Sequence, residues 1–143
     1  MIEMLIVFVV FAAAVMISIR SVGDTLRRDR VGKAAALMSA DLEQAFALAA
    51  RQRTPIRLLM NTSKMTFSIA DRGDTTFKFR ARNYATGDFA LDFFTSNKDS
   101  VDVMPNGIAT DTLRFTMGIY SSGQPYSKTI RVTRAGLVRV GNR

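Results

Sequence analysis

The sequence predicts an α+β fold: one long N-terminal helix that packs its distal half against an antiparallel β-sheet. Two observations predict this fold. A nearly continuous apolar run over residues 1–19 is followed by apolar residues at helical spacing from Val31 to Ala49, and after Pro55 apolar residues alternate with a period of two. Neither the helix stripe nor one sheet face can be buried alone, so we expect them to cover each other. We therefore expect a membrane-spanning half-helix over residues 1–19, an amphipathic half-helix over residues 20–54, and a β domain over residues 55–143.

The N-terminal segment MIEMLIVFVVFAAAVMISI has only two polar side chains, Glu3 and Ser18. A helix of these nineteen residues would rise about 28 Å, close to the hydrocarbon thickness of a bilayer. A cleaved signal peptide is the rival interpretation, and it requires basic residues before the apolar run and a small-residue cleavage site after it. No basic residue precedes the run here, and Arg20 follows it directly. A retained lipid-bilayer anchor therefore fits better.

The second half of the helix has one continuous apolar stripe. Its members follow one another at spacings of four and three: Val31, Ala35, Met38, Leu42, Ala45 and Ala49. The polar residues between them, Asp41 included, are expected to face away. Pro55 predicts the end of the helix just after Arg53, and Gly23 and Gly32 are positions where it could bend.

Beyond Pro55, alternating residues predict half-buried strands near 65–69, 77–80, 101–103, 113–117 and 130–133. Turn signals lie between them at 71–74, 105–107 and 122–125. The last strands are expected to form a hairpin with a three-residue loop over 134–136, in which Gly136 takes a positive φ. That loop pairs Val132 with Val138 and places Arg131 opposite Arg139 on the outer face.

The composition argues against an enzyme. The chain has no cysteine and no histidine, which removes thiolate nucleophiles, the usual general base near neutral pH and the commonest metal ligand. No phosphate-binding loop, dinucleotide fingerprint or nucleophile motif occurs, and we predict no catalytic, cofactor or metal site. The pairs Asp71/Asp74 and Asp99/Asp102 could hold a cation, but such aspartates usually serve turn chemistry.

Glu3 is the most informative single residue, because a carboxylate within an apolar helix costs a few kcal/mol unless it has a partner. One interpretation is that Glu3 simply reaches the lipid headgroups from its position near the chain start. The other is a role in assembly, in which the amino terminus of a neighbouring helix neutralises the carboxylate and sets the register of a helix bundle.

The N-terminal stretch, Met1-Ile2-Glu3-Met4 and the apolar helix after it, resembles the processed start of type IV pilins and pseudopilins, which typically reads Phe-Thr-Leu-Ile-Glu. Further segments resemble the GspH/FimT group of minor pseudopilins. These are Asp41-Leu42-Glu43-Gln44-Ala45, Ala49-Ala50-Arg51-Gln52-Arg53, Leu113-Arg114-Phe115, Gly123, Ile130-Arg131-Val132 and Gly136-Leu137-Val138.

The resemblance implies a structural minor subunit of a type II secretion pseudopilus or a type IV pilus, assembled through its N-terminal helix with Glu3 as the assembly residue. The implied partners are other pilins or pseudopilins, the inner-membrane assembly platform, and prepilin peptidase acting on an upstream-extended precursor. It also implies a single-pass protein of the bacterial inner membrane with its C-terminal domain in the periplasm. The arginines after the span would favour the cytoplasm by the positive-inside rule, and here we follow the resemblance.

The net charge of +8 is concentrated towards the C-terminus, where residues 112–143 contain six basic groups and no acid. The candidate anion-contact set is Arg131, Arg134, Arg139 and Arg143. Such a cluster suits phosphate contacts and gives an alternative function, a minor pilin that binds DNA during DNA uptake. The competing interpretation is a solvated basic edge that prevents strand-to-strand aggregation.

Overall fold

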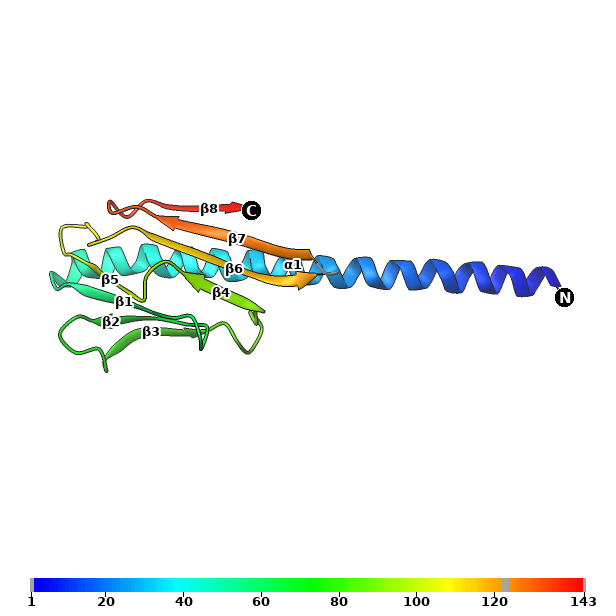
Figure 1. The fold of residues 1–143 in the computed structure, drawn as a ribbon, viewed down its shortest axis with the longest axis horizontal. Coiled ribbons are helices and arrows are strands. Elements are labelled where there is room, and N and C mark those ends of the chain that lie inside the picture. Colours follow the sequence, from blue (N-terminus) through cyan, green and yellow to red (C-terminus); the bar gives the residue numbers. More distant parts are fainter. Residues whose placement is uncertain (1, 122–123, 143) are drawn as a thin grey trace.

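The computed structural model describes residues 2–121 and 124–142, which form one long helix followed by antiparallel strands (Figure 1). The helix α1 spans Ile2–Gln52. The strands are β1 (Ile56–Asn61), β2 (Thr66–Asp71), β3 (Lys78–Asn83), β4 (Phe93–Ser96), β5 (Ser100–Val103), β6 (Leu113–Ser121), β7 (Gln124–Val132) and β8 (Val138–Asn142). The predicted α+β fold is confirmed.

The helix follows the predicted pattern closely. All six stripe residues from Val31 to Ala49 are fully buried. The helix continues through Gly23 and Gly32 without interruption. It ends at Gln52, and Arg53 has a φ of 54°, the left-handed conformation with which many helices terminate. Pro55 then starts the connection to β1, so the predicted stop is correct.

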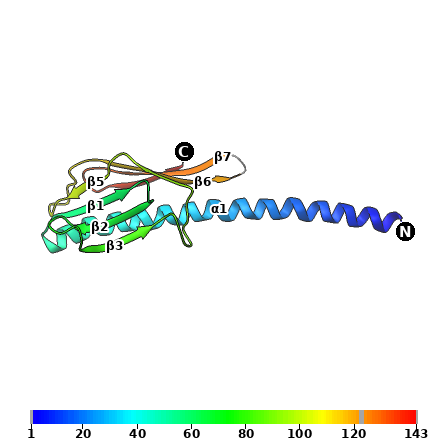
Figure 2. The same ribbon diagram turned by 60° about the horizontal axis from the view of Figure 1, so that its bottom comes forward.

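The strands form two four-stranded sheets, whereas the sequence pattern predicted one. Their orders are β3-β2-β1-β5 and β4-β6-β7-β8, with antiparallel pairing throughout. Figure 2 shows both sheets lying along the distal half of α1, while the first half of the helix extends beyond them. Strand β4 was not predicted, because its adjacent residues Phe93 and Phe94 break the alternation.

Aromatic side chains join the two sheets over the helix. The Phe115 ring of β6 meets the Phe67 ring of β2 edge-on at 6.2 Å and stacks on Phe94 of β4 at 5.9 Å. Tyr84 stacks on Phe94 at 5.8 Å, and its hydroxyl lies 3.3 Å from the Met38 sulfur on α1. Burial raises the pKa of the Tyr84 hydroxyl. The core thus connects both sheets with the helix.

Strand β3 directs arginine side chains towards the helix. This differs from the strand predicted near 77–80, in which Phe77 was expected to lie on the buried face. Phe77 precedes the strand and is 59% exposed. Arg80 and Arg82 pair with Ile69 and Phe67, the inward-facing residues of β2, so both arginines lie on the inner face. A register shift between Ile69 and Ala70 accompanies this change.

Asp41 of α1 forms ion pairs with both arginines. Its carboxylate accepts hydrogen bonds from Arg80 Nη1 at 2.7 Å and Arg82 Nε at 2.8 Å, and its side chain is only 2% exposed. The expectation that Asp41 faces away from the core is therefore wrong. A buried aspartate is tolerated because two guanidinium groups neutralise it. This ion-pair cluster ties α1 to β3.

Candidate functional site

The first half of α1 exposes apolar side chains on every side. Residues 6–11 are six consecutive apolar residues with exposed fractions between 58% and 70%. Six successive residues exceed one helical turn, so the apolar surface encircles the axis. Met4, Val15 and Met16, on either side of this stretch, are exposed as well. A helix that is apolar all round is normally buried, and no element of the described chain covers residues 6–11.

Glu3 lies in the first turn of this helix and is exposed. A negative charge there is favourable to the helix dipole. Among the described residues, no basic side chain forms an ion pair with it. A neutralising partner for Glu3 therefore has to come from outside these residues, which keeps the assembly role a prediction.

The predicted membrane span receives no support from the part of the chain that the structure describes. No helical stretch of those residues combines the length and the hydropathy required to cross a bilayer. The side chains of residues 1, 2, 5 and 17–21 lie outside those described. The predicted division of the chain at residue 19 stays a prediction.

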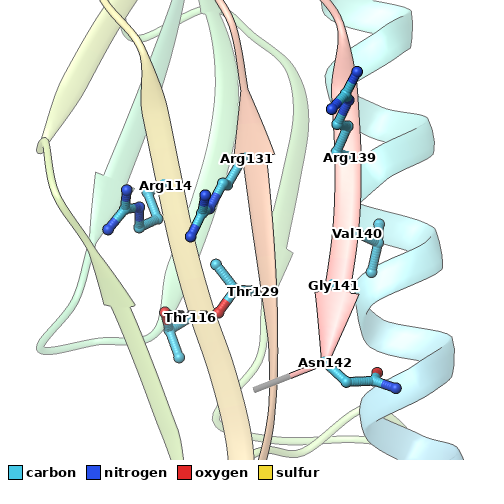
Figure 3. A pocket seen from close by; sticks show the side chains of 8 residues that line it. All are labelled: Arg114, Thr116, Thr129, Arg131, Arg139, Val140, Gly141 and Asn142. Carbon is cyan, nitrogen blue, oxygen red and sulfur yellow. Dashed lines mark hydrogen bonds between the residues drawn. The ribbon is translucent and has the colours of Figure 1, made fainter.

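The outer face of the sheet β4-β6-β7-β8 brings three arginines into one row. Arg114 of β6 pairs with Arg131 of β7, which pairs with Arg139 of β8. All three are exposed, and within the described residues none has an acidic partner. The row lies along a groove of about 470 Å³ that Thr116, Thr129, Val140, Gly141 and Asn142 also line (Figure 3). The surface is suited to an anion.

The register of the C-terminal hairpin agrees with the prediction. Val132 pairs with Val138 and Arg131 with Arg139. Thr133 N donates to the Leu137 carbonyl at 3.0 Å, which closes the three-residue loop, and Gly136 has a φ of +78°. The sequence pattern therefore correctly predicted that two of the four candidate arginines face each other across the strands.

The other two candidate arginines are not part of this row. Arg134 lies in the hairpin loop, where its carbonyl accepts a hydrogen bond from Ala109 N at 2.7 Å. Arg143 lies outside the described residues. Arg114 was missed as a member of the site. The turn signal at 122–125 could have revealed it, because pairing Ser121 with Gln124 places Arg114 opposite Arg131.

Three of the four aspartates considered for a cation, Asp71, Asp74 and Asp102, have other partners. Asp71 accepts a hydrogen bond from Gly73 N, and Asp74 accepts from Thr76, which lowers the pKa of the Asp74 carboxyl. Asp102 bonds to Arg57 at 2.6 Å and lies 3.1 Å from Arg72; the Arg57 hydrogen bond holds its pKa below the usual range. These contacts support the interpretation that these three aspartates serve turns and ion pairs.

Comparison with solved structures shows the fold. The chain is similar to the type IV minor pilin FimU of Pseudomonas aeruginosa, with a TM-score of 0.62 and 17% identity over 80% of this chain and 90% of that one. A second crystal form of FimU gives a TM-score of 0.58 and 16% identity, covering 77% of this chain and 91% of that one. The minor pseudopilin EpsH from the type II secretion system of Vibrio cholerae gives 0.56 and 11%, covering 79% of this chain and 97% of EpsH. No protein-family model and no curated protein matches the sequence. The predicted pilin-like fold is therefore confirmed.

Proposed function

We propose that this protein is a structural minor subunit of a type II secretion pseudopilus or a type IV pilus. The observation that carries the proposal is the bare apolar half of α1, which projects beyond a folded domain of pilin-like architecture. The similar solved structures are a minor pilin and a minor pseudopilin, which supports a filament role over an enzymatic one. A filament places such helices side by side, where each buries the surface of its neighbours.

The free energy available from this packing is large. Full burial of one Val, Ile, Phe or Met side chain contributes about 1.5–3 kcal/mol. Residues 6–11 alone supply six exposed apolar side chains, all valine, isoleucine or phenylalanine. Part of that gain offsets the entropy lost on association. Apolar contacts of this kind favour packing without fixing the register between helices.

In this proposal, Glu3 sets the register between neighbouring helices in the filament. Once the helices pack, a carboxylate that is exposed in the isolated subunit becomes surrounded by apolar side chains. An unpaired charge there is penalised by several kcal/mol, so only the register that brings a cationic group to Glu3 is stable. The amino terminus of a neighbouring processed subunit is such a group.

Before assembly, the apolar half of α1 also needs an environment other than water. We propose the lipid bilayer of the inner membrane, with the C-terminal domain in the periplasm. Prepilin peptidase would process an upstream-extended precursor, and the inner-membrane assembly platform would then pass the subunit into the filament. These steps depend on the resemblance of the N-terminal segment to pilins.

Photo-crosslinking tests the filament interface directly. A benzophenone amino acid replaces Phe8 on the bare helix, which is 70% exposed, and in a control variant replaces Phe77 on the domain, which is 59% exposed. Irradiation of cells that assemble filaments should link the Phe8 variant to other pilin-like subunits far more than the Phe77 variant. Glu3→Gln in the Phe8 background should reduce these products. Equal crosslinking from both positions would refute the proposal.

DNA binding is the second candidate, and the row formed by Arg114, Arg131 and Arg139 favours it. Duplex DNA would contact such a row through phosphates, with an affinity that falls steeply as salt rises. A mobility-shift titration compares the wild type with a variant in which Arg114 and the four predicted arginines, Arg131, Arg134, Arg139 and Arg143, are all glutamine. Binding that survives the five substitutions, or no binding at low salt, would remove this candidate.

A further inference from the structure

The border strand β8 has a free edge as well as a basic face. In the sheet order β4-β6-β7-β8 it pairs with β7 on one side, and no strand of the described chain pairs with it on the other. It forms one border of the domain in Figure 1. An unpaired border presents backbone donors and acceptors that another extended segment can use.

The hydrogen-bond pattern identifies which backbone groups are free. Thr133 N donates to the Leu137 carbonyl, so this pair is hydrogen-bonded. Because hydrogen-bonded pairs alternate along an antiparallel ladder, Arg131–Arg139 and Thr129–Gly141 are hydrogen-bonded as well. The amides and carbonyls of Val138, Val140 and Asn142 consequently point to the free edge.

The two faces of β8 differ in chemistry. On the outer face, Arg139 continues the row from Arg131 and Arg114, and Gly141 leaves open space beside Thr129. On the inner face, Val138 is half-buried and Val140 is 46% exposed. A strand added here would bring acidic side chains to the arginines on one face and apolar side chains to the valines on the other.

We propose that the free edge of β8 binds an extended acidic segment of a partner protein, whose residues alternate between acidic and apolar. The segment adds as a fifth strand, which is a recurring mode of peptide recognition. Charge complementarity supports this occupant, because residues 112–143 carry six basic groups and no acid. The inference uses only the C-terminal sheet, so it stands or fails separately from the filament role of α1.

Two observations distinguish this edge from one that is merely protected against aggregation. Protected edges commonly carry inward-pointing charges or proline, in addition to the short length and outward charge that β8 shares with them. Strand β8 instead places valines on its inner face, and it contains no proline. The free backbone groups and Val140 also favour an extended peptide over DNA, since phosphates would use the arginines alone.

The test is a titration of the full chain in detergent micelles with a labelled peptide containing three Glu-Val repeats, and separately with duplex DNA. Arg139→Glu should weaken peptide binding by about tenfold or more, because it places a like charge opposite the acid. Val140→Pro removes one outward N–H while sparing the bonds to β7, and it should weaken binding similarly. Lys64→Glu makes the same charge change in the exposed β1–β2 turn and should have no effect.

Amide hydrogen exchange provides a readout that does not depend on the variants. The peptide should slow exchange at Val140 and Asn142, whose amides face the free edge. Failure of the peptide to bind, or unchanged binding by the folded Val140→Pro variant, would overturn the inference. Duplex DNA that binds more tightly than the peptide and leaves exchange at these amides unchanged would also overturn it, in favour of phosphate contacts.

Discussion

Replacing Asp41 with asparagine should reveal how strongly the ion-pair cluster holds the helix to the first sheet. The carboxylate accepts three hydrogen bonds from Arg80 and Arg82, at 2.7, 2.8 and 3.3 Å, and its side chain is 2% exposed. Asparagine keeps the shape but loses the charge, and its amide NH₂ would meet a guanidinium donor. Breaking a fully buried ion pair costs about 3–5 kcal/mol.

The partial exposure of Arg80 and Arg82 makes the expected loss of stability smaller than this. The side chains of Arg80 and Arg82 are 38% and 30% exposed, so both guanidinium groups can regain part of their hydration when the carboxylate is lost. We therefore expect Asp41→Asn to lower the free energy of unfolding by about 2–3 kcal/mol. Urea unfolding of a fragment of residues 26–143, followed by circular dichroism, measures this value.

The matched control is Asp29→Asn on the same helix. Asp29 pairs with Lys33 at 2.7 Å, but the two side chains are 54% and 65% exposed. An exposed i,i+4 pair contributes about 0.3–0.5 kcal/mol, so the control should change stability little. If the two variants lose similar stability, or if Asp41→Asn and Arg82→Gln prove additive in a double-mutant cycle, the cluster does not act as argued.

Three further predictions follow from other parts of the structure. The fragment of residues 26–143 should be soluble and largely β by circular dichroism, because it keeps every core residue of the helix. It loses the 2.6 Å hydrogen bond between Asp24 and Ser121. Aggregation of the fragment without detergent would contradict this prediction. Gly118→Ala should destabilise the fragment by at least about 1–3 kcal/mol in urea, since its Cβ would overlap the Tyr126 carbonyl and the Phe93 ring. The pKa of Asp102 is lower in the folded protein than its ordinary value of 3.8, so its ionised form stabilises the fold. This stabilisation is complete above pH 3.8 and is lost as the pH falls through the lower pKa of the folded state. Asp102→Asn should therefore flatten the dependence of the free energy of unfolding on pH in that acidic range.

The helix could be predicted in detail because its signals are local. The spacing of Val31, Met38, Leu42 and Ala49 defines a buried face wherever the helix packs, and Pro55 ends it regardless of the fold. Asp41 is an exception to this helical pattern. Its inward position depends on Arg80 and Arg82, which are about forty residues away, and no helical pattern contains that information.

The candidate anion surface was partly predictable for the same reason. The opposition of Arg131 and Arg139 followed from one tight loop, since loop length sets hairpin register. The third member, Arg114, is joined to them through the pairing of β6 with β7. The sequence only suggested that the basic C-terminal strand lies at an edge. The sheet order establishes it, because a strand is a border only in relation to the order of the whole sheet.

By itself, the sequence determined the long helix, its apolar first half, its buried stripe and the C-terminal hairpin, since each depends on residues close together in the chain. Only the tertiary structure decided that there are two sheets, that Asp41 is buried between arginines, and that the strand beside the arginine row is the last of its sheet. Those features arise from pairings between distant strands, whose choice rests on the packing of the whole core rather than on any local pattern.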